Sequence, residues 1–375
     1  MEQEKSTNSL ILAQYFQDSA LPSAIMGHST KDGKTEWHAY GPSIWNTSDT
    51  VTRDHIFRIA SMTKAITSVA ALQLVERGLV SLDEPLYELM PEMDTIPILT
   101  ETGQLTKSKE SITLRHLLTH TSGFGYSFTS PRLASFEATD WHYEDSPRLF
   151  EPGESWHYGT SIDWVGRVVE KVSGDDLETY IRKNITGPLK MTRTFFNVPD
   201  SLKSEIVSWG VRDSTGFKET QRIPDGPVTS YSGGGGLYSS PADYLTFLIC
   251  LLNDGTYDNR KILMAETVEM LFQNHLPEGQ NIVFDIPEGK FVSLAGGFPD
   301  ESDKHGLSWA IEDSKDEVVR SKGAGYWAGI GNSYYTIDKK KGVAVVYFTQ
   351  FLPFNDKVSF DFYRFYEKQV YSQLD

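Results

Sequence analysis

The sequence is poor in cysteine and in positive charge. Only one of its 375 residues, Cys250, is a cysteine, so no disulfide can form within the chain. Cys250 stands in an apolar run, where a buried thiol without catalytic function is expected. The chain has 35 Lys and Arg against 51 Asp and Glu, a net charge of -16. This balance disfavours nucleic acids and anionic membrane surfaces as partners.

Long apolar segments are also missing. No run reaches the roughly 18 apolar residues of a membrane-spanning helix. The first residues, Met-Glu-Gln-Glu-Lys-Ser-Thr-Asn, lack the basic and apolar regions of a secretory signal. We therefore expect no membrane association and a cytoplasmic location, or a periplasmic or secreted one if a leader precedes these residues.

Three familiar functional motifs are absent or incomplete. Thr121-Ser122-Gly123 lacks the first glycine of the Gly-x-Ser-x-Gly esterase turn. The glycines at 233–236 lack the Gly-Lys-Ser/Thr ending of a phosphate loop, so they predict a tight turn over the cleft. His116 and His120 have a spacing that metal ligands use, but no third ligand is evident. We expect packing or capping roles for both histidines, and no metal or cofactor.

The most informative motif is Ser61-Met62-Thr63-Lys64, which opens a predicted helix ending at Gly78. Residues three apart share a helix face, so the Lys64 ammonium is expected beside the Ser61 hydroxyl. Free N–H groups at the helix start favour negative charge there. A serine hydroxyl needs a neighbouring base to act as a nucleophile, and Ser-x-x-Lys is a known catalytic pattern.

Strand patterns occur near both ends of the chain. Residues 24–40 predict two strands around an Asp-Gly turn, and 334–337 and 343–348 predict two more. Helical patterns occupy 8–17, 114–118, 161–172, 242–253, 265–274 and 358–374.

Together these patterns predict an α/β (α+β) fold. An antiparallel sheet, built from both termini and flanked by helices, would carry an inserted, mostly helical lobe. We place a discontinuous sheet domain at 1–85 and 280–375, and a helical domain at 86–279. The active site is expected in the cleft between them.

Four segments stand in the order and rough spacing of the serine beta-lactamase/penicillin-binding-protein superfamily. They are the Ser61 motif, Thr113–Phe124, Glu151–Thr160 and Gly323–Asn332. From about residue 20 onward the chain resembles the class C-like branch of that superfamily. The resemblance implies a serine beta-lactamase-like fold and an acyl-enzyme on Ser61.

Within this superfamily the chain is most similar to the family VIII carboxylesterases and related transesterases. Tyr158-Gly159-Thr160 stands where the lactamases carry Tyr-x-Asn, and 323–325 is Gly-Ala-Gly instead of Lys-Thr-Gly. Trp327-Ala328-Gly329 resembles the Trp-Gly-Gly of the esterases. Lys322 lies one residue before the position at which the lactamases carry the lysine of Lys-Thr-Gly. That lysine would pair with the carboxylate of a beta-lactam or of a peptide C-terminus, so its loss favours neutral acyl chains and ester leaving groups.

The resemblance also implies roles for particular residues. Ser61 would be the nucleophile, and Lys64 and Tyr158 would share proton transfer as general base and acid. Which of the two takes the serine proton stays open, because an adjacent lysine and tyrosine titrate as a unit.

An oxyanion site needs two N–H donors. One is expected from the Ser61 amide. The other would be the amide of Ile330, or of Tyr326 if the lactamase register holds. The predicted pocket is completed by Trp327, Gly329 and Thr160.

We therefore predict a serine hydrolase that cleaves carboxylic esters, with short acyl chains, through a Ser61 acyl-enzyme. The expected partner is a small-molecule ester or beta-lactam-like substrate, and the oligomeric state stays open. The alternatives are a beta-lactamase or D-amino-acid peptidase, an acyltransferase, and a non-catalytic binding module on the same fold.

Overall fold

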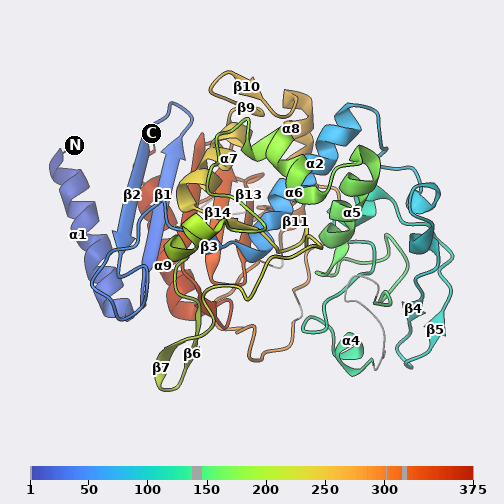
Figure 1. Ribbon diagram of the computed structural model, residues 1–375, viewed down its shortest axis with the longest axis horizontal. Helices are drawn as coiled ribbons and strands as arrows, with labels where there is room; N and C mark the ends of the chain where they lie inside the picture. Colours follow the sequence, from blue (N-terminus) through green and yellow to red (C-terminus); the bar gives the residue numbers. More distant parts are fainter. Residues whose placement is uncertain (1, 137–145, 285, 301, 315–318, 375) are drawn as a thin grey trace.

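The structure is a computed structural model, and it describes residues 2–136, 146–284, 286–300, 302–314 and 319–374. Its largest element is a seven-stranded antiparallel sheet in the order β11-β12-β13-β14-β15-β1-β2 (Figure 1). The first and last parts of the chain meet in this sheet, as predicted. Its strands are β1 (Ala24–Thr30), β2 (Thr35–Tyr40), β11 (Lys304–His305), β12 (Ala310–Ile311), β13 (Gly325–Gly329), β14 (Ser333–Asp338) and β15 (Val343–Phe348).

Strand β15 joins the N-terminal and C-terminal parts of the sheet. Val346 lies opposite Gly27 of β1 on one side and Tyr335 of β14 on the other. All six residues of β15 are buried. Because both of its faces are covered, β15 is a continuous apolar run instead of an alternating one.

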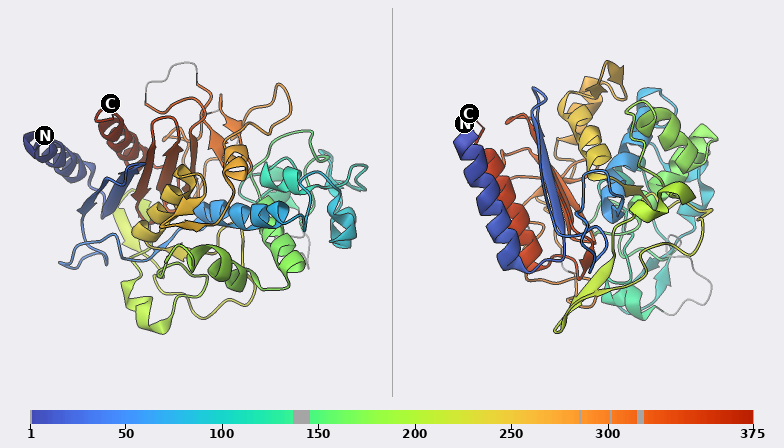
Figure 2. Two further views of the ribbon diagram at one scale, coloured as in Figure 1. Left: turned by 90° about the horizontal axis from the view of Figure 1, so that it is seen from above. Right: turned by 60° about the vertical axis from the view of Figure 1, so that its left-hand side comes forward.

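Helices cover the two faces of the sheet. Helix α1 (Glu2–Ser19) and helix α9 (Lys357–Tyr371) lie side by side on the outer face (Figure 2). Helix α7 (Pro241–Leu252) packs against β15 and β1 from the other face. The sheet therefore forms the middle layer of this part of the molecule.

The helical part is organised around α2 (Thr63–Glu76), which packs against α5 (Ser161–Ser173). Every residue from 63 to 74 is buried, so α2 has no solvent-facing stripe over those turns. Helix α5 ends at Gly174, whose φ of 74° is the left-handed conformation of a helix C-cap.

The remaining elements are short. The helices are α3 (Leu114–Leu118), α4 (Pro131–Ser135), α6 (Leu177–Ile181) and α8 (Ala265–Leu271), with 3₁₀ turns η1 (Ala60–Met62), η2 (Leu86–Glu88), η3 (Pro91–Asp94) and η6 (Asp200–Glu205) and a π-helical turn η5 (Arg182–Thr186). The strands are β3 (Phe57–Arg58), β4 (Ile98–Leu99), β5 (Leu105–Thr106), β6 (Gly210–Asp213), β7 (Gly216–Glu219), β8 (Tyr238–Ser239), β9 (Thr256–Tyr257), β10 (Arg260–Lys261) and β16 (Phe351–Leu352).

The structure refines several expected boundaries. The predicted helix at 8–17 is longer, and the one at 265–274 ends three residues earlier. The division into 1–85 with 280–375 and 86–279 stays a prediction. Helix α7 falls within 86–279 by sequence, but it packs on the sheet. None of the helices in the described ranges is both long and apolar enough to cross a bilayer.

Candidate active site

Ser61 lies on the tight turn η1, which connects strand β3 to helix α2. The predicted position at the first turn of the helix needs a small correction, because α2 begins at Thr63. The preceding residue, Ala60, has a φ of 44°. This left-handed conformation costs a residue with a side chain about 1–2 kcal/mol. Such strain is typical of positions where a backbone must present a functional group.

The structure brings together the three side chains predicted to be catalytic. The Tyr158 hydroxyl donates a hydrogen bond to Ser61 Oγ at 2.6 Å. Lys64 Nζ donates to the same oxygen at 3.3 Å and lies 4.7 Å from the centre of the Tyr158 ring. Ser61 Oγ is therefore in contact with both candidate proton carriers.

Lys64 is a buried cation held by neutral oxygen atoms. It is only 1% exposed, and it forms no ion pair with a carboxylate of the described residues. Besides Ser61, its acceptors are the Tyr126 hydroxyl at 3.1 Å and the Gly234 carbonyl at 2.7 Å. These three acceptors match the three N–H groups of an ammonium.

Tyr126 was missed by the sequence analysis. It lies two residues beyond the end of Thr113–Phe124, a segment that was singled out for its resemblance to the superfamily. The segment predicted a loop but no side chain aimed at Ser61. The position of Tyr126 depends on the path of that loop, which brings its hydroxyl within 3.1 Å of Lys64 Nζ.

The glycine-rich segment supports Lys64 from the other side. Residues 233–235 form a turn between α2 and α5, and Thr67 donates a hydrogen bond to the Gly233 carbonyl. The Asp163 carboxylate accepts hydrogen bonds from the Gly234 amide at 3.0 Å and the Ser232 hydroxyl at 2.6 Å. A side chain at position 234 would collide with Asp163, with its Cβ only 2.4 Å from the carboxylate. The glycine is therefore needed to bring its carbonyl to Lys64.

Behind Tyr158 lie two buried histidines. The His120 ring is 5.0 Å from the Tyr158 ring and 5.6 Å from the His305 ring, measured between centres. Burial lowers the pKa of His120 well below its usual value, and His305 and Lys64 act in the same direction. Burial also lowers the pKa of His305 to about 4, against the effect of its contact with the Gly306 carbonyl. Both rings are thus neutral near pH 7.

The other histidine of the predicted pair has a structural role. The His116 side chain accepts from the Thr113 amide, and the Thr113 hydroxyl accepts from the His116 amide. This reciprocal pair caps helix α3. His116 and His120 therefore act in capping and packing, as predicted.

A small aromatic cavity, which we call the Ser61 pocket, opens beside Ser61. Its volume is about 30 Å³. Many of the residues that line it come from the described residues between 284 and 298 and from the end of β13 and the residue after it. They are Ser61, Phe128, Tyr158, Phe284, Ile286, Val292, Phe298, Trp327, Ala328, Gly329, Ile330 and Phe354.

Three of the predicted pocket residues, Trp327, Gly329 and Ile330, line the Ser61 pocket. Tyr326 does not line it, because its hydroxyl bonds to Asp303 and its ring borders a different cavity. Thr160 is buried next to α5 and lies outside the lining as well.

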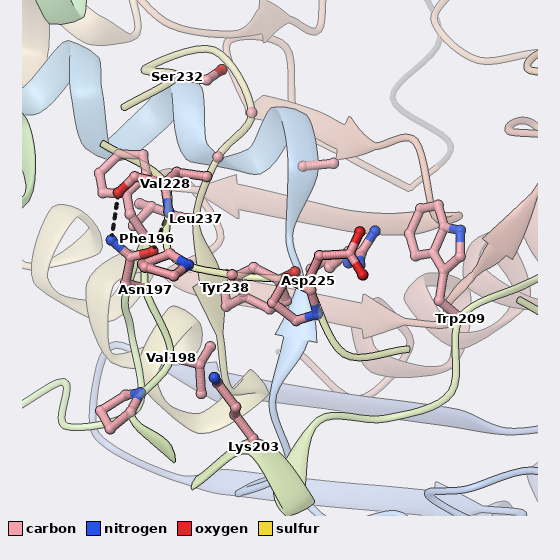
Figure 3. Close-up of a pocket in the computed structure, with 18 of the residues that line it drawn as sticks. Phe196, Asn197, Val198, Lys203, Trp209, Asp225, Val228, Ser232, Leu237 and Tyr238 are labelled. Carbon is pink, nitrogen blue, oxygen red and sulfur yellow. Dashed lines mark hydrogen bonds between the residues drawn. The ribbon is translucent and has the colours of Figure 1, made fainter. Parts of the chain in front are cut away.

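A larger cavity, which we call the groove, lies next to the Ser61 pocket and has a volume of about 970 Å³ (Figure 3). Phe196 and Trp209 stand on opposite sides of it in Figure 3. Asn197 fixes one wall through two hydrogen bonds with the Val228 backbone, at 2.8 and 2.9 Å. Ala60, the chain neighbour of Ser61, also lines the groove.

Arg58 is a cation of the groove without a carboxylate partner among the described residues. Its guanidinium lies 5.5 Å from the centre of the Trp209 ring and 5.7 Å from that of Tyr238. The Nε atom is buried and has no hydrogen-bond partner. Lys203, in contrast, is paired with Asp200 at 2.6 Å.

Comparison with known families and proteins agrees with this geometry. The family model described as Beta-lactamase matches residues 16–365. The chain is 34% identical to monacolin J acid methylbutanoyltransferase of Aspergillus terreus, over 84% of this chain and 82% of that protein. It is 32% identical to lovastatin esterase of Penicillium rubens, over 78% and 79% of the two chains.

Solved structures show the same fold. Unliganded simvastatin synthase from Aspergillus terreus superposes with a TM-score of 0.82 and 29% identity, covering 97% of this chain and 98% of that one. EstCE1, a hydrolase with promiscuous acyltransferase activity, gives a TM-score of 0.78 at 19% identity, covering 98% of both chains. The predicted superfamily and fold class are thereby confirmed.

The contact between Gly234 and Lys64 leads to a prediction. In Gly234→Ala the added methyl group must displace the Asp163 carboxylate or the turn, which moves the carbonyl away from Lys64. Loss of a hydrogen bond to a charged group is worth about 1.5–3 kcal/mol, so ester turnover should fall roughly 10- to 100-fold. The measurement is kcat/KM with p-nitrophenyl acetate, alongside thermal unfolding.

Gly235→Ala is the matched control, because a Cβ there meets only ordinary contacts at 3.9 and 4.0 Å. Its loss of turnover should be much smaller. Similar losses in the two variants would show that the position of the Gly234 carbonyl does not matter for turnover.

Proposed function

The chain belongs to the beta-lactamase family, and we propose that it transfers the acyl group of a small-molecule ester to an alcohol or to water through an acyl-enzyme on Ser61. The observation that carries this proposal is the double contact of Ser61 Oγ, at 2.6 Å to Tyr158 and 3.3 Å to Lys64. A serine with two adjacent proton carriers is the arrangement that nucleophilic catalysis requires.

In the proposed mechanism Lys64 is a fixed positive charge and Tyr158 carries the proton. All three N–H groups of Lys64 already have acceptors, so the ammonium form satisfies its surroundings. The ammonium lies 4.7 Å from the centre of the Tyr158 ring and donates to Ser61 Oγ, so its positive charge stands beside the two side chains that exchange the proton. The short contact between Tyr158 and Ser61 is then the path of the proton.

The first half of the reaction forms the acyl-enzyme. Once Tyr158 has lost its hydroxyl proton to solvent, Ser61 Oγ bonds to the carbonyl carbon while the serine proton passes to the Tyr158 phenolate oxygen. The carbonyl oxygen becomes an oxyanion, for which we propose the Ser61 and Ile330 amides as donors. When the carbon–oxygen bond to the leaving group breaks, Tyr158 returns its proton to the departing alcohol.

The second half repeats these steps with a new nucleophile. An alcohol or a water molecule gives its proton to Tyr158 and attacks the acyl carbon. The bond to Ser61 Oγ breaks, and the serine recovers the proton from Tyr158. Acyl transfer and hydrolysis therefore differ only in which acceptor enters, and the named relatives include transferases and an esterase.

Esters are better supported as substrates than beta-lactams. The lysine that would pair with a lactam carboxylate is missing from the motif. The adjacent Lys322 is 63% exposed and pairs with Asp313 at 2.7 Å. The lining of the Ser61 pocket is aromatic and aliphatic apart from Ser61 and the Tyr158 hydroxyl, which suits a neutral acyl chain.

The groove favours an alcohol that carries a carboxylate. The Arg58 guanidinium donates to the Gln221 carbonyl at 3.4 Å but has no carboxylate partner among the described residues, and Arg binds carboxylates with paired N–H groups. Two relatives are named as transferases of monacolin J acid and of ML-236A carboxylate. A hydroxy acid is therefore our proposed acceptor class for this chain.

The assignment of Ser61 is tested by acylation. Wild-type protein treated with a fluorophosphonate should gain one adduct, mapped to Ser61 by mass spectrometry. Ser61→Ala should lose the adduct and lower p-nitrophenyl butyrate turnover on the order of 10³-fold or more, because removing the nucleophile disables the whole unit. Equal turnover by the two proteins would rule out Ser61, and absence of any adduct would favour a non-catalytic binding module.

The role of Lys64 is tested by Lys64→Arg. A planar guanidinium keeps the charge but cannot place three protons on the three acceptors that the tetrahedral ammonium reaches. We expect a loss of turnover of roughly 10²-fold or more, nearly as large as in Lys64→Ala. Circular dichroism should show an intact fold, since Arg is a good helix former. Retention of most turnover would mean that positive charge alone suffices at position 64.

The role of Arg58 is tested with a matched pair of esters, the butyrate of 4-(hydroxymethyl)benzoic acid and that of its methyl ester. Arg58→Met should lower kcat/KM for the acid by roughly 10- to 100-fold, with a smaller effect on the neutral ester. Lys203→Met is the control, because Lys203 is already paired with Asp200. Equal losses on both esters would refute a carboxylate contact at Arg58.

A further inference from the structure

The Ser61 pocket and the groove meet at one side chain. Among the residues that line the two cavities, Ile330 alone belongs to both. Ser61 lines the pocket, and its neighbour Ala60 lines the groove. A carbonyl carbon attacked by Ser61 therefore has one compartment on each side of it.

We propose that Ile330 divides the bound ester between these compartments, with the acyl chain in the Ser61 pocket and the alcohol half in the groove, and that its side chain sets the selectivity for both halves. This inference rests on the proposed acyl transfer at Ser61 and adds the residue that determines which esters react.

The size and chemistry of the two cavities assign the halves of the ester. The Ser61 pocket has about 30 Å³ of free volume and is lined by packed aromatic rings. The Phe298 ring lies 5.6 Å from both Trp327 and Phe354, and Phe284 lies 5.8 Å from Tyr158. Closely packed rings leave room for only a short acyl chain.

The groove suits a much larger group. Its volume of about 970 Å³ is in the range of cavities that hold a drug-sized molecule. Apolar surface from Phe196, Trp209 and Tyr238 surrounds the polar group of Arg58. A bulky, mostly apolar alcohol with a polar substituent matches this lining, and a short acyl chain would leave most of it empty.

Ile330 is held rigidly at the boundary. Its neighbours Gly329 and Gly331 have no space for side chains, since a Cβ would lie 2.5 Å from the Ile59 carbonyl oxygen and 2.5 Å from Gln350 Nε2, respectively. The next residue, Asn332, donates hydrogen bonds to the carbonyls of Phe351 and Pro353, at 2.9 and 2.8 Å.

The turn between β13 and β14 therefore has a fixed backbone and presents one side chain to both cavities. A β-branched isoleucine has few rotamers, so its methyl groups form a wall instead of a movable gate. This rigidity is what allows a single residue to limit the acyl chain and the alcohol at once.

The test is a set of four esters with two acyl chains, butyryl and octanoyl, on two alcohols, ethanol and 2-(2-naphthyl)ethanol. Ile330→Ala should raise kcat/KM for octanoyl relative to butyryl esters by roughly tenfold or more, the scale of a few methylene groups in an apolar pocket. It should also change the preference between the two alcohols. Ile330→Val should shift both ratios in the same direction by less, and it serves if the alanine variant is unstable.

Two control variants touch one compartment each. Val292→Ala, which lines only the Ser61 pocket, should change the acyl ratio but leave the alcohol ratio in place. Val228→Ala, which lines only the groove, should do the reverse. If Ile330→Ala turns over these esters with the acyl ratio and the alcohol ratio both unchanged, Ile330 does not separate the two halves of the ester. The proposed acyl transfer at Ser61 would still stand in that case. Absence of Ser61-dependent turnover in the wild type would instead overturn both.

Discussion

The arrangement around Ser61 depends on a buried positive charge that has no carboxylate partner among the described residues. An isolated ammonium is expensive to bury unless each of its protons meets an acceptor. Here Ser61, Tyr126 and the Gly234 carbonyl supply those acceptors, and α5 supports the last of them through Asp163. Because no carboxylate of the described residues neutralises Lys64, its positive charge acts on the neighbouring side chains of Ser61 and Tyr158.

The same constraint explains why the helical part and the sheet must pack together for a site to exist. Ser61 and Lys64 follow β3, Tyr158 precedes α5, and Ile330 directly follows the sheet strand β13. Gly329 brings that strand within contact of the backbone before Ser61, where a larger residue would collide with Ile59. The place where these elements meet also separates a small aromatic pocket from a larger groove, so the geometry that places Ser61 beside Lys64 and Tyr158 also creates two unlike compartments.

Family membership establishes the fold of this protein, whereas the choice of reaction and substrate depends on particular residues of the site. The family is shared with a transferase and an esterase, and the fold also with more distant solved structures, so the fold does not by itself select a reaction. Our proposals for this chain therefore rest on local features. They are the missing motif lysine, the Arg58 guanidinium without a carboxylate partner among the described residues, and the isoleucine at position 330.

Much of the site was predictable from sequence because its chemistry depends on short spacings. Ser61 and Lys64 share a helix face by their separation, and the strands at both ends follow from apolar patterns and an Asp-Gly turn. Tyr158 was identified through motif resemblance, since no local rule relates it to a serine 97 positions earlier. The sequence by itself thus determined the fold class and predicted that Ser61 and Lys64 lie side by side, as they do.

Only the tertiary structure decided what surrounds them. Tyr126 reaches Lys64 because of the path of its loop, and Tyr326 turns toward Asp303 instead of the Ser61 pocket. The groove is lined by segments as far apart in the sequence as Arg58 and Ile330, and Ile330 also lines the Ser61 pocket. Contacts of this kind depend on how distant segments pack, and residue spacing along a chain carries no information about that packing.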